Sequence, residues 1–403
     1  MMERLRIQIL GLYILLIPFD NFKIFPFSIS SIIGIIYILL CISRDTKFNK
    51  QLLLEVTPFL LSFIIITCST FINSENTDIK KGPENPINAI ILYFIMVIVL
   101  LLTVSQEVNF KYFNKIITYL FVSVSIASLT GIYELYMVLF KGTFVFGQQF
   151  IQYFPIAGSY LLRIRGSYFD PNYFSFLPIF GIICANWIVK SRSLKLIINL
   201  IFIILILTTI SRMAIICLII YYAIIFIPKQ LFWRLLAPLI LIALPLSIYL
   251  LTKAVGFFID FNPGSSNDRF EIISGSIKMF ISSPIWGYGF NVRSPVDLDT
   301  HNSYLQILLY GGLIAFFSIF IPVTICYLNI KNLKSENEGL MKVRFFLISS
   351  FFPFIGFLFF LSYLMIKLFW IYLLILFLGK NLLYSSTNSD TRLTEPENKL
   401  EIE

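Results

Sequence analysis

The fold class is decided by one stretch of the sequence, residues 196–226, which reads LIINLIFIILILTTISRMAIICLIIYYAIIF. Its length and its lack of alternation between apolar and polar residues are typical of membrane-spanning helices. It is too long for one upright helix, and the charge of Arg212 is unfavourable at the centre of a bilayer. We therefore predict two short helices, 195–210 and 211–227, that meet at Ser211 and Arg212 near a membrane face.

The rest of the chain has the same apolar character. Of its 403 residues, 58% are hydrophobic and 13% are charged, and the mean hydropathy is +0.86. Soluble proteins carry about 25% charged residues, so the composition excludes a soluble domain. Only helices and closed barrels satisfy their backbone groups in lipid, and long apolar runs favour helices. The sequence predicts an all-α fold, a polytopic integral membrane bundle.

Apolar windows predict about twelve transmembrane helices without an internal repeat. The first window follows Arg4 and Arg6 and lacks a small-residue cleavage site, so we interpret it as a membrane helix and not as a signal peptide. The bundle comprises residues 1–379, and the polar tail, residues 380–403, is expected to be disordered. The windows are 7–19, 24–42, 52–72, 87–104, 114–140, 168–189, 195–210, 211–227, 234–252, 303–328, 344–361 and 363–379.

The distribution of charge predicts the orientation in the membrane. The chain has 31 lysines and arginines against 22 acidic residues, a net charge of +9. With the N-terminus in the cytoplasm, most of these cations fall in predicted cytoplasmic segments, which are enriched in Lys and Arg in membrane proteins. An even number of spans then places both termini in the cytoplasm. The basic balance is thus explained by topology, and nucleic acid is not an expected partner.

Five arginines depart from this rule. They lie in the two long external loops, 141–167 and 253–302, or at the break within 196–226: Arg163, Arg165, Arg212, Arg269 and Arg293. A guanidinium binds phosphate or carboxylate through two parallel hydrogen bonds, which lysine cannot do. An external anionic ligand such as a lipid phosphate explains their position. Alternatively, each is a surface or snorkelling side chain.

The loop 253–302 is the largest aqueous segment. Apolar residues recur at helical spacing between Asp268 and Ser282, which predicts a short amphipathic helix over the mouth of the bundle. The apolar stripe consists of Phe270, Ile273, Ile277 and Phe280.

His301 is the single histidine of the chain and the natural general base or acid, because an unperturbed imidazole titrates near neutrality. It lies where the loop 253–302 enters the membrane, and Asp297 and Asp299 are placed to orient its ring. Alternatively, it caps a helix. A single histidine excludes a multi-histidine metal site, and the five cysteines lack metal-site spacing.

A second candidate segment begins the window 168–189. Asp170 and Pro171 have the pattern of a helix N-cap followed by proline at the first helical position, which indicates a structural role. Asn172 lies in the first turn of a membrane helix, where its amide needs a partner.

Taken in order, these pieces resemble the O-antigen ligase and O-antigen polymerase superfamily over about residues 163–314. They are Arg163-x-x-Gly166 with Asp170-Pro171-Asn172, Ser211-Arg212, Arg269 with PIWGYG at 284–289, and HNSYLQ at 301–306 with GGLI at 311–314. The resemblance implies a multi-pass GT-C type enzyme of the bacterial inner membrane. Such enzymes move a glycan from undecaprenyl diphosphate to an acceptor on the periplasmic side, without a metal or cofactor.

The resemblance also implies roles for residues. His301 would deprotonate the acceptor hydroxyl, and a direct displacement would invert the anomeric carbon. Arg163 or Arg165, Arg212 and Arg269 would hold the diphosphate, with Asn172, Asn302 and Asp299 in support. The sequence does not distinguish Arg163 from Arg165, and Arg293 has no counterpart in the motif.

Three functions stay open. We favour a polymerase that joins lipid-linked repeat units, because the polymerases are the more diverse, Phe- and Ile-rich members of the superfamily. A ligase would use the same donor with lipid A core as acceptor. A flippase is disfavoured because the spans hold few acids, Glu55 and Glu134 being the clearest, and no repeat. The implied partners are the carrier-linked oligosaccharide, the acceptor glycan, membrane lipid and other membrane proteins of polysaccharide assembly.

Overall fold

The structure is a computed structural model of the chain. It describes residues 2–20, 23–24, 27–42, 49–74, 85–106, 108–142, 151–154, 159–168, 170–226, 265–290, 292, 300–333, 337–359, 361–362 and 364–394.

Helices make up most of the described chain. They are α1 (Met2–Leu15), α2 (Ile29–Ile42), α3 (Lys50–Val56), α4 (Pro58–Ile72), α5 (Pro86–Val104), α6 (Phe110–Lys141), α7 (Pro171–Ile188), α8 (Arg192–Thr208), α9 (Arg212–Phe226), α11 (Ser265–Ser282), α12 (Ser303–Asn332), α13 (Glu338–Leu358) and α14 (Lys367–Thr394). A 3-10 turn, η1 (Ile17–Phe19), follows α1. Two antiparallel hairpins pair β1 (Lys23–Ile24) with β2 (Phe27–Ser28) and β3 (Ile151–Phe154) with β4 (Ser159–Leu162).

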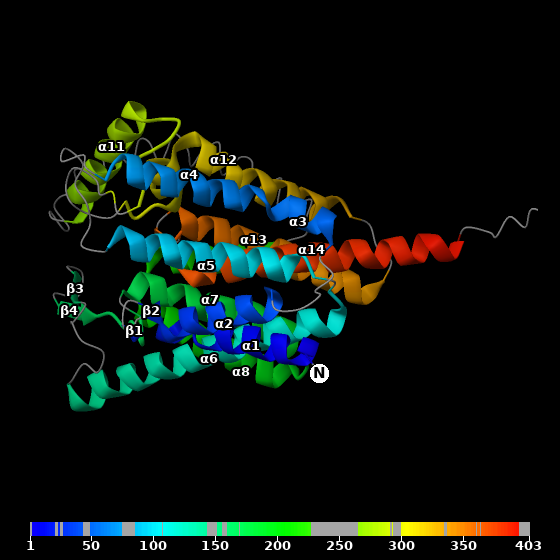
Figure 1. Ribbon diagram of the computed structural model, residues 1–403. Helices are drawn as coiled ribbons and strands as arrows, with labels where there is room; N and C mark the ends of the chain where they lie inside the picture. Colours follow the sequence, from blue (N-terminus) through cyan, green and yellow to red (C-terminus); the bar gives the residue numbers. More distant parts are fainter. Residues whose placement is uncertain are drawn as a thin grey trace, which may run out of the picture.

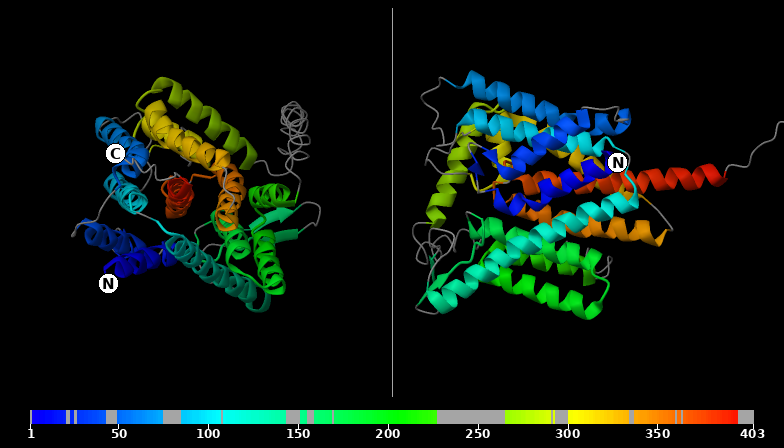
Figure 2. Two further views of the ribbon diagram at one scale, coloured as in Figure 1. Left: turned by 90° about the vertical axis from the view of Figure 1, so that its right-hand side faces the viewer. Right: turned by 60° about the horizontal axis from the view of Figure 1, so that its bottom comes forward.

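Most helices run side by side along one axis (Figure 1). Both hairpins lie at one end of this bundle, which we call the hairpin end. The N-terminus and the last residues of α14 lie at the opposite end, which we call the termini end. α11 lies across the hairpin end instead of along the axis (Figures 1 and 2). The two ends of the described chain therefore lie at the same end of the bundle.

α14 is the central helix of the bundle. Viewed from the end, it lies inside a ring of other helices (Figure 2). Every residue from Leu368 to Leu378 is at most 2% exposed, as expected for a helix that is apolar on all sides. Trp370 packs edge-on against Phe59 of α4 and Tyr93 of α5, with ring centroids 5.9 and 5.2 Å apart. The core of the molecule is thus built around the last predicted span.

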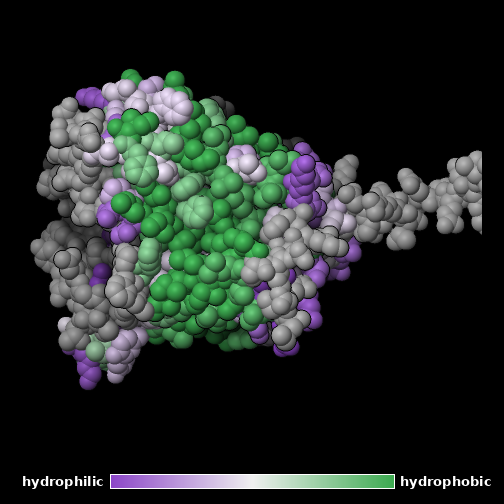
Figure 3. Space-filling view, viewed as in Figure 1, coloured by the Kyte–Doolittle hydropathy of each residue, from purple (hydrophilic) through white to green (hydrophobic). Residues whose placement is uncertain are grey.

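The surface has the layout of a membrane protein. An apolar belt surrounds the middle of the bundle, with polar residues gathered toward its two ends (Figure 3). Within the described residues, six helices are long and apolar enough to cross a membrane. The chain is a polytopic helical membrane protein, whereas the predicted number of about twelve spans is not confirmed.

The predicted windows can be compared with the helices. Every window except 234–252, which lies outside the described residues, contains a helix. The break predicted within 196–226 is present, because α8 ends at Thr208 and α9 begins at Arg212. The window 24–42 is helical only from Ile29, since β1 and β2 precede α2. α14 continues through Thr394 and so extends into the segment predicted to be a disordered tail.

α11 covers the predicted amphipathic helix, and its packed face overlaps the predicted stripe in part. Ile272 and Ser276 are buried, whereas Ile273 and Ile277 of the predicted stripe are 41% and 42% exposed. Phe280 of the same stripe is partly buried against the core, and the side chain of Phe270 lies outside the described part. The helix itself was predicted correctly. Which of its side chains pack against the bundle depends on the direction in which α11 crosses the hairpin end.

Candidate functional site

Residues 163–168, between β4 and α7, form a loop that we call the arginine loop. Its backbone is held by two side chains one turn apart on α6. The Glu134 carboxylate oxygen Oε2 accepts hydrogen bonds from the N–H groups of Arg165 (2.8 Å) and Gly166 (2.7 Å). The Thr130 hydroxyl accepts one from the Ser167 N–H (3.0 Å). Glu134 is 1% exposed, so its charge is buried to hold this loop.

Gly166 is the residue that lets this loop approach α6. Its φ of +56° is in the left-handed region, which favours glycine. An added Cβ would lie 2.9 Å from the Thr130 hydroxyl and 3.2 Å from the Gly131 nitrogen. The glycine in the quoted motif therefore has a packing role.

The Arg163 side chain connects two further segments to the loop. Its Nε donates to the Thr209 carbonyl (2.7 Å), and its terminal nitrogen donates to the Asn172 side-chain oxygen (2.7 Å). The Ile164 N–H donates to the Thr208 carbonyl (3.1 Å). Asn172 thus has the partner that its position demanded. The arginine loop, the start of α7 and the turn between α8 and α9 meet in one place.

Arg165 and Tyr168 are buried members of the same loop. Arg165 is 8% exposed, and its positive charge interacts electrostatically with the Glu134 carboxylate. Burial raises the pKa of the Tyr168 phenol, and the nearby Asp20 carboxylate raises it further. Tyr168 therefore stays neutral.

The start of α7 is capped as predicted. The Asp170 carboxylate accepts a hydrogen bond from the Asn172 N–H (2.7 Å), and Pro171 occupies the first helical position.

His301 precedes α12 in an unusual backbone conformation. Among the described residues, two that are not glycine have a positive φ, Ile210 (+52°) and His301 (+46°). L-residues seldom adopt this region, and such residues gather at functional sites. Ile210 lies directly before Ser211 and Arg212. Both strained residues thus lie in segments that the sequence had selected, and Arg212 itself begins α9 with an exposed side chain.

The residues on both sides of His301 are anchored to the connection between α13 and α14. The Asn302 amide donates to the Phe359 carbonyl (3.0 Å), while its oxygen caps α12 at the Leu305 N–H (3.0 Å). The Thr300 and Ser362 hydroxyls are 3.1 Å apart. The Asn302 cap and the Ser362 contact hold the backbone around His301 in place.

Ser362 joins the two candidate segments. Its carbonyl and its N–H each lie 3.2 Å from the Tyr173 hydroxyl of α7, which accepts from the N–H and donates to the carbonyl. Tyr173 adjoins Asn172, the partner of Arg163. A continuous chain of contacts therefore runs from the arginine loop through Ser362 to Thr300 and His301. Sequence reasoning missed Ser362, because a serine after an apolar run carries no signal of its own.

Comparison with known protein families gives the decisive observation. Residues 196–320 match the model of a family described as O-antigen ligase. This segment, less than half of the chain, is similar to the O-antigen ligase family. The predicted resemblance is thereby confirmed. The match runs from α8 into α12 and includes Arg212, Arg269 and His301, whereas the arginine loop lies outside it. Among curated proteins, none matches the chain.

Within the matched segment, two quoted motif pieces have a structural role. The segment 284–289 crosses a break in α12, where the Tyr288 N–H donates to the Leu309 carbonyl (2.7 Å) and the Gly289 N–H to the Tyr310 carbonyl (2.8 Å). At the break, Gly312 has a φ of +62°. A Cβ on Gly287 would lie 2.6 Å from the Leu309 oxygen. These glycines therefore let two backbones touch.

Several predicted site residues are not placed. Arg269 belongs to α11, which lies at the same hairpin end (Figure 1), but its side chain is outside the described part. Arg293, Asp297 and Asp299 also lie outside the described residues. In the described part, no group of three His, Cys, Asp or Glu side chains could hold a metal.

Proposed function

We propose that this chain is a polymerase of O-antigen or a similar surface polysaccharide. It transfers a glycan from undecaprenyl diphosphate to the acceptor sugar of another lipid-linked repeat unit, on the periplasmic face of the bacterial inner membrane. The similarity of residues 196–320 to the O-antigen ligase family supports a membrane enzyme with lipid-linked glycan substrates. The observation that carries the proposal is the set of contacts that joins Arg163 to Asn172, Tyr173 to Ser362, and Ser362 to Thr300, the residue before His301.

In the proposed reaction His301 acts as general base. It accepts the proton of the acceptor hydroxyl, whose oxygen attacks the anomeric carbon of the donor sugar. The bond between that carbon and the diphosphate oxygen breaks, and its electron pair leaves with the diphosphate. One displacement inverts the carbon. General-base catalysis of this kind contributes about 10² to 10⁴ in rate.

Arginines take the developing negative charge in this proposal. Arg163, Arg165, Arg212 and Arg269 are the candidates, with Asn172 and Asn302 as supporting groups and Asp299 as a proposed orienting group for His301. Planar guanidinium groups match a phosphate through paired hydrogen bonds, and charge fixed before the reaction needs little reorganisation. Arg163 and Arg212 belong to segments whose backbones touch at Thr208 and Thr209, which favours a shared ligand.

A ligase is the second candidate, because the matching family model is described as O-antigen ligase. It would use the same donor, base and arginines, with lipid A core as acceptor. A lipid-linked oligosaccharide flippase is the third and weakest candidate, since it would need no general base.

The deciding experiment is the length distribution of surface glycan on a gel. Cells lacking the protein are complemented with the wild type or with His301→Ala, and immunoblots confirm equal amounts in the membrane. A polymerase predicts a ladder that collapses to one repeat unit on the core and returns only with the wild type. Loss of all core-attached glycan with accumulation of carrier-linked polymer would instead identify a ligase. Near-normal ladders with His301→Ala would contradict both.

A further inference from the structure

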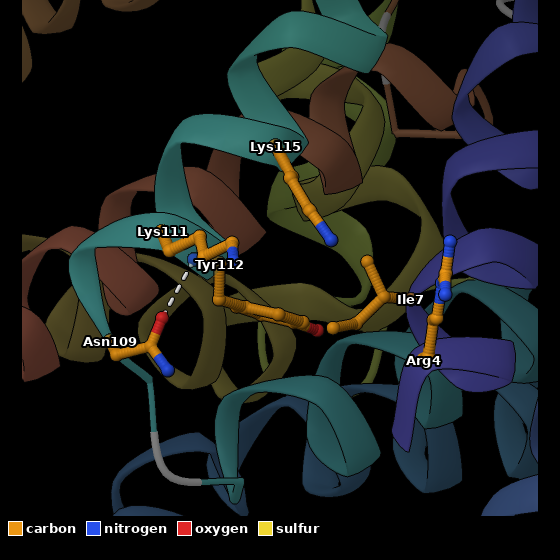
Figure 4. A pocket seen from close by; sticks show the side chains of 6 residues that line it. All are labelled: Arg4, Ile7, Asn109, Lys111, Tyr112 and Lys115. Atoms are coloured by element: carbon orange, nitrogen blue, oxygen red, sulfur yellow. Dashed lines mark hydrogen bonds between the residues drawn. The ribbon is translucent and has the colours of Figure 1, made fainter. Parts of the chain in front are cut away.

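A basic cavity lies between α1 and α6, at the end of the bundle away from the candidate site. It has a volume of about 500 Å³ and is lined by Arg4, Ile7, Asn109, Lys111, Tyr112 and Lys115. Figure 4 shows the Lys115 side chain extending from α6 toward the space bordered by Ile7 and Arg4 of α1. Three cations from two helices thus surround one opening, and no carboxylate is among the described lining residues.

The packing of the two helices fixes the spacing of these cations. Gly11 of α1 lies so close to α6 that an added side chain would overlap the Tyr119 ring. The Ser123 hydroxyl of α6 donates to the Ile14 carbonyl of α1 (2.8 Å). Lys111 and Lys115 are one turn apart on α6 and therefore share a face. The two backbones that carry the cations are therefore held at a fixed spacing.

The start of α6 adds a second favourable feature. Asn109 caps the helix through its side-chain oxygen, which accepts from the Tyr112 N–H (2.8 Å). Helix N-termini carry partial positive charge, which favours a bound anion. Tyr112 is 8% exposed and forms the floor between the cations. Charge, helix dipole and shape all favour one singly or doubly charged anion.

We propose that this cavity binds the phosphate headgroup of an anionic membrane lipid. The cavity lies at the termini end, where polar residues border the apolar belt (Figures 1 and 3). Acyl chains could lie along the exposed apolar side chains of α1 while the phosphate meets Arg4, Lys111 and Lys115. Cytoplasmic leaflets are rich in anionic lipid, and each nearby cation contributes about a fivefold factor in affinity. The site is separate from the proposed catalytic residues.

The test measures lipid retention by the purified full-length protein. Native mass spectrometry in neutral detergent compares phosphatidylglycerol with phosphatidylcholine of the same acyl chains. The test variant is Arg4→Gln/Lys111→Gln/Lys115→Gln. The matched control, Lys190→Gln/Arg192→Gln/Lys331→Gln, removes the same charge from exposed positions at the same end. Thermal unfolding without added lipid checks the fold of each, and Lys115→Gln alone replaces a triple variant that unfolds.

The wild type and the control are expected to retain phosphatidylglycerol over phosphatidylcholine, while the test variant loses about tenfold or more of that preference. Inorganic phosphate at millimolar concentration should not displace the lipid. Equal loss in the test and control variants would overturn the proposal, because it would indicate attraction by overall charge. Full displacement by inorganic phosphate would also overturn it and identify a site for small anions.

Discussion

At the scale of single residues, buried polar groups explain why the arginine loop has one conformation. Glu134 is a carboxylate in a membrane helix, which is unfavourable unless its hydrogen bonds are made. Its oxygen satisfies two backbone N–H groups that would otherwise be buried without a partner. The same reasoning applies to Asn172, whose amide oxygen accepts from Arg163. The sequence marked both residues as unusual for a membrane span.

Two substitutions of Glu134 distinguish the contribution of its hydrogen bonds from the contribution of its negative charge. Glu134→Ala leaves two buried N–H groups unpaired, at about 1–3 kcal/mol each, and should reduce glycan transfer at least tenfold. Glu134→Gln keeps a carbonyl oxygen that can accept both bonds and should retain most of the activity. Initial rates in membranes at equal protein abundance provide the measurement. An equal loss in both variants would show that the negative charge, and not the hydrogen bonding, matters.

Tyr173 tests the link between the two candidate segments. Tyr173→Phe removes both contacts with the Ser362 backbone and should lower transfer about tenfold, because Thr300 and His301 lose an anchor. Tyr372→Phe is the control, since it removes a buried hydroxyl that lies 3.2 Å from Ser350 in the interior of the bundle. Thermal unfolding of the two variants should be similar. If Tyr372→Phe lowers transfer as much as Tyr173→Phe, the anchor has no special role.

At the scale of elements, helix ends and breaks place the candidate residues. α8 and α9 are separated at Ile210, α7 begins at a capped Asp170 and α12 begins directly after His301. The segment 284–289 then holds the kink of α12 at Gly312. The Ser-Arg, Asp-Pro and His-Asn pairs marked the first three of these positions in the sequence, whereas the kink of α12 was not predicted, because 303–328 reads as one apolar run. Helix ends in this protein therefore carry the site, while helix interiors carry the packing.

Gly312→Ala tests the crossing at the α12 kink. The new Cβ would collide with the backbone at Ile285 and Trp286, in addition to the strain of a φ of +62°. Gly142→Ala controls for a positive φ alone, because Gly142 (φ +62°, ψ +19°) has no atom within 4 Å of the added Cβ. Gly312 (φ +62°, ψ −160°) combines the collision with a backbone region that is essentially confined to glycine. We expect about 1–2 kcal/mol of destabilisation for the control and about 1–3 kcal/mol more for Gly312→Ala. Equal unfolding temperatures in detergent would argue against the crossing.

At the scale of the whole molecule, α14 ties the bundle together at its hairpin end. Lys367, the first residue of α14, is 3% exposed, and its ammonium lies 2.8 Å from the Asp20 carboxylate. It also contacts the hydroxyls of Ser28 (2.6 Å), Ser30 and Ser31 (2.8 Å). The connection between α1 and α2 is thus fastened to the central helix. Asp20 is also near Tyr168, so this anchor borders the arginine loop.

Removing the charge of Asp20 should lower the stability of the protein more than removing the charge of Lys367. The Lys367 side chain is 4% exposed and that of Asp20 is 27% exposed. Asp20→Asn leaves a buried ammonium without a counter-ion and should destabilise by about 3–5 kcal/mol, whereas Lys367→Met leaves a carboxylate that water reaches and should cost less. Glu338→Gln, in an exposed pair with Lys342, should leave the unfolding temperature nearly unchanged, because water screens the pair. Unfolding in detergent is the measurement, and a larger loss for Lys367→Met would contradict this account.

The sequence by itself determined the class of the fold, the positions of most helices and the segments that carry the candidate chemistry. These properties follow from local patterns, because apolar run length and helix-end residues act over a few turns. The tertiary structure decided which segments meet. The bond from Arg163 to Thr209, the bridge through Ser362, the covered face of α11 and the central place of α14 each join residues distant in the chain. Such contacts depend on how helices pack against one another, and helix packing is a property of pairs of surfaces and not of any single segment.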